Sequence, residues 1–342
     1  NGLGCVDYLS FGSESGRLAP LREAAAILAS EPAMFSDTLK KQLSNGVPYP
    51  KAQAAALTSC KISQESLTLL KEPNNLLATE YLKAIIRQKS PLQPIAIRRL
   101  GCGYHELQTE HIQNFASASG LRSVLLQEQE TARRKTQEIP WQVSHSTLSQ
   151  IPKDLHPIYQ AGQLFPIRPD DISLLFHYQL LTCMERGIPL REFSDISSEL
   201  EGRLKRQAFL FQPFSQRIQA LKTKQYTYTR ISRALLHMTL NIRQEDMDFY
   251  RRKGYCSYAR ILGFWRRSSP LFSHIKKQST IPVIAKASDA PKKLSEKGRK
   301  LWNQDCYCSH IYQAILQQAY PNQITAAGPF LTNEYSRPLV IL

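Results

Sequence analysis

The chain has 342 residues, 42% of them hydrophobic, which is long and apolar enough for two domains with ordinary cores. It has no run of about 18 apolar residues and no basic region at its start, so we predict no membrane-spanning helix or signal peptide and expect a cytoplasmic protein. A formal net charge of +16 favours an anionic partner. The seven cysteines are odd in number and scattered, which excludes a disulfide framework.

The start of the chain predicts a strand that leads into a glycine-containing turn. Residues 5–11 have the composition of a buried strand, residues 12–16 that of the turn leaving it, and residues 20–30 that of a helix. A glycine at the carboxyl end of a parallel strand lets a ligand approach the backbone closely. Alone, such a turn is weak evidence for a ligand site.

Two further helices are predicted between residues 35 and 60. They are separated by residues 45–50, which contain Gly46 and two prolines and form a clear stop signal. Helices between two predicted strands indicate a partly parallel sheet covered by helices, which is an α/β arrangement.

Residues 73–122 combine a helix, a strand and a polar loop. Apolar residues at helical spacing predict a helix over residues 76–86, capped by the side chain of Asn74 or Asn75. A strand over residues 94–97 then delivers Arg98 and Arg99, and a serine-rich turn is predicted at residues 117–122. A positive helix end facing two arginines suits phosphates or a nucleotide. The alternative is an ordinary helix cap with two solvated arginines.

The second half of the chain is predicted to be mostly helical. Residues 127–169 are polar and interrupted by five prolines, which is typical of a connecting segment. The predicted helices that follow cover residues 172–181, 199–211, 214–223 and 228–242.

The positive charge belongs to one region. Between Glu201 and Gln304 there are 23 Lys and Arg against 6 Asp and Glu, a net of +17, which leaves 21 against 22, or −1, elsewhere. A nucleic-acid backbone is the usual soluble polyanion. The alternatives are a solvated basic helical face and, less favoured without an amphipathic anchor, an acidic membrane surface.

Basic residues in this region alternate with tyrosines. Cations hold phosphates while aromatic faces stack on unpaired bases, a combination typical of single-stranded RNA recognition. An amphipathic helix whose tyrosines pack in the core explains the same pattern. The expected RNA contacts are Lys222, Lys224, Arg230, Arg233, Arg251 and Arg252.

Neither a metal site nor a catalytic set is predicted. Cys306, Cys308 and His310 are metal-binding types, but a two-residue spacing on a helix points them in different directions. His105 could act as a general base, although a lone histidine is more often a surface or packing residue. We find no Ser-His-Asp set or Walker loop, so we name no catalytic residue.

Six blocks of sequence together resemble the bacterial tRNA(Met) cytidine acetate ligases. The combination is specific, it follows the order of that family, and it covers nearly the whole chain, although no single block is specific. The blocks are residues 11–16 (Phe-Gly-Ser-Glu-Ser-Gly), 73–84 (Pro-Asn-Asn-Leu-Leu-Ala-Thr-Glu-Tyr-Leu-Lys-Ala), 99–105 (Arg-Leu-Gly-Cys-Gly-Tyr-His), 117–122 (Ser-Ala-Ser-Gly-Leu-Arg), 228–230 (Tyr-Thr-Arg) and 258–263 (Tyr-Ala-Arg-Ile-Leu-Gly).

The resemblance implies an enzyme that activates acetate with ATP to acetyl-adenylate and acetylates the wobble cytidine of elongator tRNA(Met). Mg²⁺ would accompany the ATP, and no protein-bound metal is expected. The implied fold is α/β plus α: part of a Rossmann-like nucleotidyltransferase domain over residues 1–130, a connecting segment over 131–170, and a basic, mostly helical tRNA-binding domain over 171–342. No membrane partner is expected.

The resemblance also implies particular site residues. By residue match, the family's ATP contacts fall on Gly12, Asn74, Arg99 and Leu100. Ser119 and Arg122 match a turn that related nucleotidyltransferases place near the phosphates.

One feature of the family has no counterpart in the sequence. The family opens with a strand leading into an Asn-Pro-Phe-His-x-Gly-His loop that binds the ATP phosphates, and no such loop is found. We therefore expect an amino-terminally incomplete member that does not form acetyl-adenylate alone. Two alternatives stay open: an adenylyltransferase acting on a small metabolite, which has no use for a +17 region, and a noncatalytic RNA-binding protein.

Overall fold

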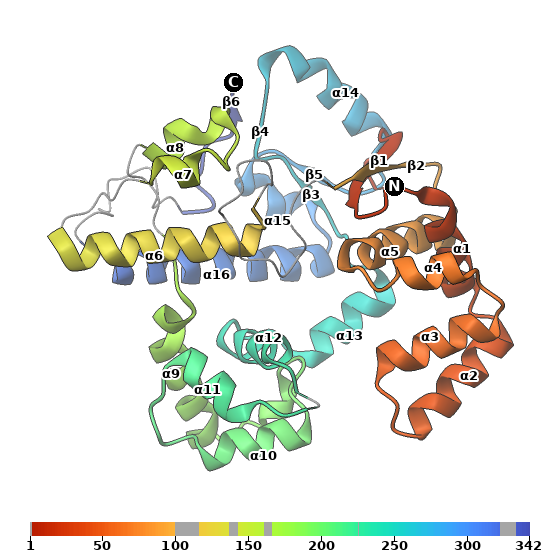
Figure 1. Ribbon diagram of the computed structural model, residues 1–342. Coiled ribbons are helices and arrows are strands. Elements are labelled where there is room, and N and C mark those ends of the chain that lie inside the picture. The colour runs from red at the N-terminus through yellow and green to blue at the C-terminus, as the bar shows by residue number, and fades with distance from the viewer. Residues whose placement is uncertain (1, 100–115, 137–142, 161–165, 225, 322–332) are drawn as a thin grey trace. The chain divides into compact units, whose positions relative to one another are not determined.

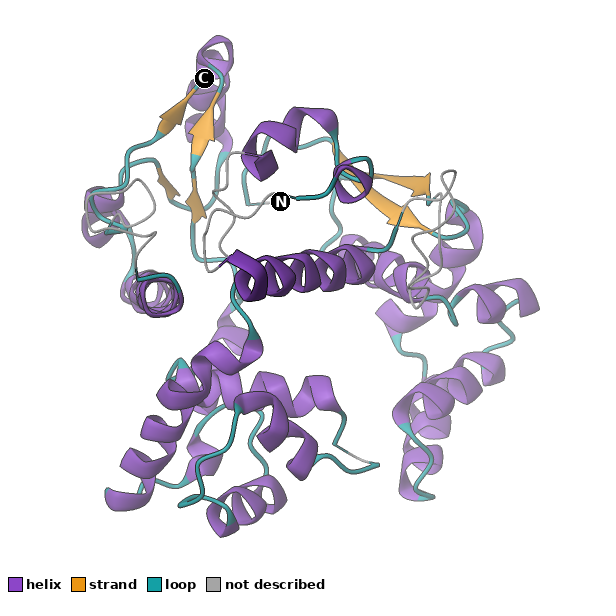
Figure 2. Cartoon of the chain, turned by 60° about the vertical axis from the view of Figure 1, so that its left-hand side comes forward, coloured by secondary structure: helices purple, strands orange, loops and turns teal. Residues whose placement is uncertain are grey.

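The computed structural model describes residues 2–99, 116–136, 143–160, 166–224, 226–321 and 333–342 (Figure 1). The chain divides into two compact units, one containing Leu3–Gln163 and the other Gly2 with Leu164–Leu342. Helices dominate the described residues, and the strands are few and short (Figure 2). The mixed α/β class is as predicted, whereas the domain limits at residues 130 and 170 stay a prediction.

The first unit contains a two-stranded parallel sheet. Strand β1 (Tyr8–Ser13) pairs with β2 (Gln93–Arg98) in a register that runs from Tyr8 opposite Gln93 to Ser13 opposite Arg98. The strand predicted at residues 94–97 is thus confirmed. The first strand begins three residues later than predicted and continues through Gly12 and Ser13. Phe11 and Ser13 on one face of β1 are buried, while Tyr8 on the other face is 62% exposed.

Five helices connect these strands and form the core of the unit. Helices α1 and α5 pack against each other and against Phe11 of β1. The predicted helices at residues 20–30, 35–60 and 76–86 are all present. The connecting helices are α1 (Leu18–Ser30), α2 (Ala33–Ser44), α3 (Tyr49–Ser59), α4 (Gln64–Leu69) and α5 (Pro73–Arg87).

The predicted serine-rich turn at residues 117–122 is wrong, because these residues start helix α6 (Ala118–Thr136). Ser117 Oγ accepts a hydrogen bond from the Gly120 amide at 3.1 Å, which is the geometry of a serine helix cap. The same residue types favour turns and caps, so the sequence pattern does not separate them. The unit continues with α7 (His145–Leu148), the 3-10 helix η1 (Lys153–Leu155) and α8 (His156–Gln160).

The second unit is mostly helical, as predicted. Its main core lies between α9 and α12, and a smaller core surrounds Trp302. Its helices are η2 (Pro169–Ile172), α9 (Ser173–Glu185), η3 (Leu190–Glu192), α10 (Ser198–Arg206), α11 (Phe214–Leu221), α12 (Tyr228–Thr239), α13 (Gln244–Lys253), η4 (Arg266–Ser268), α14 (Ser269–Gln278), η5 (Ala287–Asp289), α15 (Ala290–Lys293) and α16 (Glu296–Ala319).

Among its described residues, the second unit also contains four short strands, and one of its helices ends earlier than predicted. β3 (Ala259–Arg260) pairs in parallel with β5 (Val283–Ile284), and β4 (Gly263–Phe264) with β6 (Val340–Ile341). The helix predicted over residues 199–211 ends at Arg206. Pro213 follows shortly and disfavours helical backbone at the residue before it. Across the described ranges, no helix combines the length and hydrophobicity needed to cross a bilayer.

Candidate functional site

The carboxyl ends of β1 and β2 bring together two of the predicted ATP contacts. The Arg99 amide donates to the Ser13 carbonyl at 2.9 Å, which places Arg99 directly after the paired strands. Gly12 and Arg99 are both exposed, and a Cβ at Gly12 would lie 3.5 Å from Arg99 Cγ. The arginine stem therefore runs beside the bare glycine backbone. Leu100, the fourth predicted contact, lies outside the described residues.

A second glycine shapes the turn after β1. Gly16 has a φ of +67°, and a Cβ there would lie only 2.9 Å from Arg98 Cβ. Both the left-handed backbone and the close approach of β2 require a glycine at this position. The turn thereby fits tightly against the end of β2.

The start of α5 is capped by a residue that the sequence analysis missed. The Glu14 carboxylate accepts from the Asn74 amide at 3.1 Å, from Asn74 Nδ2 at 2.6 Å and from the Asn75 amide at 2.8 Å. The predicted asparagine cap is therefore wrong: both asparagines lie inside the first turn and donate. Burial alone would raise the pKa of Glu14, but these hydrogen bonds outweigh it and lower the pKa.

This carboxylate changes where an anion can bind. The positive end of α5 already faces a negative charge from the chain itself. A phosphate at this helix end would have to displace Glu14. Gly12 and Arg99 are exposed at the same end of the sheet, and their part in binding an anion stays a prediction.

Asn75 fixes the turn from behind. It is fully buried, its Oδ1 accepts from Ser13 Oγ at 2.7 Å and from the Ser15 amide at 3.3 Å, and its Nδ2 donates to the Leu69 carbonyl at 3.1 Å. Ser13 Oγ in turn accepts from the Gly16 amide at 3.0 Å. This network ties β1, the turn and α5 into one rigid element.

Ser119 and Arg122 lie on the first turns of α6. Both are exposed, and Arg122 Nη2 donates to Ser119 Oγ at 3.3 Å. Within the described part of the chain, no hydrogen bond joins them to Gly12, Asn74 or Arg99. Their position near a phosphate stays a prediction.

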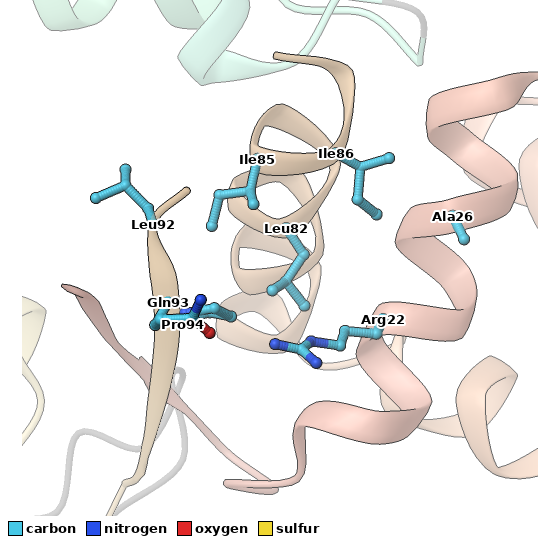
Figure 3. A pocket seen from close by; sticks show the side chains of 8 residues that line it. All are labelled: Arg22, Ala26, Leu82, Ile85, Ile86, Leu92, Gln93 and Pro94. Atoms are coloured by element: carbon cyan, nitrogen blue, oxygen red, sulfur yellow. The ribbon is translucent and has the colours of Figure 1, made fainter. Parts of the chain in front are cut away.

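The first unit also has an apolar pocket of about 380 Å³ (Figure 3). It lies at the amino end of β2, beside Gln93 and Pro94, whereas Arg99 follows the carboxyl end of the same strand. This pocket is thus separate from the predicted nucleotide contacts. Its other lining residues are Arg22 and Ala26 of α1, Leu82, Ile85 and Ile86 of α5, and Leu92.

The predicted RNA contacts of the second unit differ in whether they are already paired with an acidic side chain. Lys222, Lys224 and Arg252 are exposed, and none of them forms an ion pair within the described ranges. Arg251 pairs with Asp248 at 3.2 Å.

Two arginines on α12, Arg230 and Arg233, have different interaction partners. The Arg230 guanidinium lies over the Tyr226 ring, 4.6 Å from its centroid. Arg233 Nε donates to Asp195 Oδ2 at 2.7 Å, and this hydrogen bond lowers the pKa of Asp195 although burial opposes it. Arg230 is therefore more available to a phosphate than Arg233.

The tyrosines of this segment pack inward. Tyr226 is 6% exposed and its hydroxyl lies 2.6 Å from Ser197 Oγ, while Tyr228 packs against the main core. The packing interpretation of the alternating pattern is thus correct for these two residues. Tyr226 in particular offers no free face for base stacking, because it is buried and Arg230 lies over its ring.

The cysteine and histidine group on α16 shows three different environments: Cys306 is buried, Cys308 half-buried and His310 exposed. Among the residues that the structure describes, no three His, Cys, Asp or Glu side chains are grouped to hold a metal.

Comparison with known proteins identifies the family of the chain and solved structures with a similar fold. A family model described as HIGH Nucleotidyl Transferase matches residues 1–326. A tRNA(Met) cytidine acetate ligase of Acetivibrio thermocellus is 33% identical over 297 residues, covering 84% of this chain and 67% of the relative. One of Thermoanaerobacter sp. (strain X514) is 31% identical over 327 residues, covering 95% and 75%.

Two crystal structures of Thermotoga maritima TmcAL share the fold. The apo form gives a TM-score of 0.78 at 19% identity over all of this chain and 78% of that one, and the form bound with alpha-thio ATP gives 0.76 over 77%. The expectation that the chain lacks the amino-terminal part of the family is not supported, because the family model matches from residue 1.

Proposed function

Because the chain belongs to the HIGH nucleotidyl transferases and, among them, to the tRNA(Met) cytidine acetate ligase family, we propose that it acetylates elongator tRNA(Met). ATP and acetate are the other substrates, N4-acetylcytidine at the wobble position is the product, and the cytoplasm is the site of action. The observation that carries this proposal is identity of about 30% to such ligases over most of the chain.

The first chemical step is acetate activation. A carboxylate oxygen of acetate attacks the α-phosphorus of ATP, acetyl-adenylate forms and pyrophosphate leaves. Negative charge builds at the phosphate, so positioning and cations supply the catalysis and no protein nucleophile is needed. Arg99 beside Gly12 is the proposed cation, Arg122 a second one, and Mg²⁺ would accompany the ATP phosphates.

The second step transfers the acetyl group. The exocyclic amine of the cytidine attacks the acetyl carbonyl, AMP leaves, and the amine loses a proton. The base must leave its stack to reach the anhydride. We assign the nucleotide to the nucleotidyltransferase domain over residues 1–130 and the tRNA phosphates to residues 171–342, with a connecting segment over 131–170. The +17 charge between Glu201 and Gln304 supports this division.

The direct test is acetylation itself. The protein, expressed from its own gene, is incubated with ATP, acetate and an elongator tRNA(Met) transcript, and the nucleosides are analysed by mass spectrometry. We expect N4-acetylcytidine at the wobble position only when both ATP and acetate are present, and none in a transcript with uridine there. Failure to form it would contradict the proposal, as would acetylation without ATP.

A further inference from the structure

An exposed apolar loop joins α10 to α11 in the second unit. Phe209, Leu210 and Phe211 are 80%, 61% and 53% exposed, although three consecutive large apolar side chains in water are unfavourable. The loop packs beside α9, where the His177 ring meets Phe211 edge-on with centroids 5.3 Å apart. Tyr178 of the same helix is 67% exposed. We call Tyr178, Phe209, Leu210 and Phe211 the aromatic platform.

A buried arginine forms hydrogen bonds with the backbone of this loop. Arg217 of α11 is fully buried, and its Nη1 and Nη2 donate to the carbonyls of Gln207 at 3.1 Å and Leu210 at 2.6 Å. A buried guanidinium is costly unless such hydrogen bonds are made. The loop conformation is therefore tightly specified, and it presents both phenylalanines outward.

The loop continues into α11 through a second fixed contact. The Phe214 amide donates to Ser173 Oγ of α9 at 2.9 Å, and the Phe214 ring meets Phe176 edge-on. The carboxyl end of the loop is thus anchored to α9, while Arg217 of α11 holds its amino end at Gln207. The exposed rings are part of a rigid surface.

The charge around the platform favours an anionic partner. From Arg203 to Lys224 the sequence contains no Asp or Glu, and Arg206 is exposed directly before the loop. Lys205 pairs with Glu201, whereas Arg206 makes no ion pair in the described part of the unit. The six cations of this stretch are residues 203, 205, 206, 217, 222 and 224.

We propose that the aromatic platform stacks on unpaired bases of the tRNA, with Phe209 and Phe211 as the stacking rings and Arg206 on a neighbouring phosphate. Aromatic faces and cations together are what single-stranded RNA recognition requires. Tyr226 is buried and Tyr228 packs against the main core, whereas Phe209 and Phe211 are exposed. The inference rests on the proposed function for the identity of the RNA, and the anticodon loop is the single-stranded part that the reaction must reach.

The test compares two RNA probes by fluorescence anisotropy at several salt concentrations. One probe is the anticodon stem–loop of elongator tRNA(Met), and the other is a fully paired duplex of the same length. Phe209→Ala with Phe211→Ala should weaken stem–loop binding by about tenfold or more, because each stacked base contributes that much. Duplex binding and the slope of log K against log salt should not change, since no charge is removed.

Matched variants separate stacking from other effects. Phe209→Leu with Phe211→Leu keeps apolar area without flat rings and should weaken stem–loop binding as the alanine substitutions do. Phe209→Tyr with Phe211→Tyr should bind like wild type. Arg206→Gln should instead reduce the salt slope. Phe209 is 80% exposed and Phe211 is 53% exposed with one edge contact to His177, so the unfolding temperature of these variants should change little.

Several results would overturn the platform. One is a stem–loop affinity of Phe209→Ala with Phe211→Ala, or of Phe209→Leu with Phe211→Leu, that equals that of wild type. Another is an equal loss of affinity for the duplex. A third is a sedimentation coefficient of the free protein that differs between wild type and the alanine variant, which would show that the rings contact protein. If the protein did not acetylate the wobble cytidine but the alanine substitutions still weakened stem–loop binding, the proposed function would be wrong and the stacking role of the platform would stand. If wild type acetylated the tRNA but the alanine substitutions did not affect RNA binding, the stacking role would be wrong and the proposed function would stand.

Discussion

At the scale of single residues, Glu14 decides the electrostatics at the start of α5. Its carboxylate accepts three hydrogen bonds from the first helical turn. Glu14 and Asn74 are 60 residues apart in the chain and meet only because β1 and α5 pack together. Local sequence patterns favour an asparagine cap there, and no short-range signal identifies a carboxylate from another segment.

Replacing this carboxylate should lower stability in a pH-dependent way. We expect Glu14→Gln to reduce the free energy of unfolding by about 1 kcal/mol at neutral pH, because charge-assisted hydrogen bonds are lost at a partly exposed site. The pKa of Glu14 is lowered in the folded state. Its stabilisation is therefore present above the ordinary carboxyl pKa and is lost as the pH falls through the folded-state pKa.

Urea unfolding of both proteins at neutral and acidic pH measures this. The difference between wild type and variant should shrink in acid. Glu80→Gln, which affects only an exposed ion pair with Lys83, is the matched control and should change little at either pH. A Glu14→Gln effect that is equal at both pH values would contradict the assigned role.

At the scale of elements, the sequence predicted those whose signals are local. Helices α1, α9 and α12 and strand β2 lie where apolar periodicity placed them. The predictions of a turn at the start of α6 and of a helix beyond the end of α10 were wrong for different reasons. Ser117 forms a cap where a turn was expected, and the chain after Arg206 gives its carbonyls to the buried Arg217 of another helix.

Helix α12 offers a paired comparison for RNA binding. Arg230→Ala should weaken tRNA binding and reduce the salt slope by about 1, because it removes one phosphate contact. Arg233→Ala should have a smaller effect, since Asp195 already neutralises that side chain. Asp195→Asn should raise the affinity by releasing Arg233, and asparagine tolerates the φ of +67° at this position.

Anisotropy of labelled tRNA across a salt series measures all three variants. Arg87→Ala, which removes a surface cation paired with Glu31 in the first unit, serves as the control and should leave binding unchanged. Wild-type affinity and salt slope for Arg230→Ala, together with no gain for Asp195→Asn, would show that α12 does not contact the RNA.

At the scale of the whole molecule, charge is segregated along the chain. Residues 201–304 carry a net +17 and the remainder −1, and this was predictable because charge depends on composition alone. That Arg233 is paired was not predictable, because Asp195 reaches it only through folding, whereas Asp248 and Arg251 are three residues apart on one helix. Likewise the family resemblance implied Gly12 and Arg99, but that they lie side by side depends on the parallel pairing of β1 with β2.

In the proposed reaction, an oxygen of acetate attacks ATP before the acetyl group is transferred to the tRNA. Acetate labelled with ¹⁸O on both oxygens tests this directly when the AMP and the acetylated nucleoside are weighed by mass spectrometry. We predict one labelled oxygen in the phosphate of AMP and the other in the acetyl group of N4-acetylcytidine. Unlabelled AMP, or ADP with inorganic phosphate as the products, would contradict activation through acetyl-adenylate.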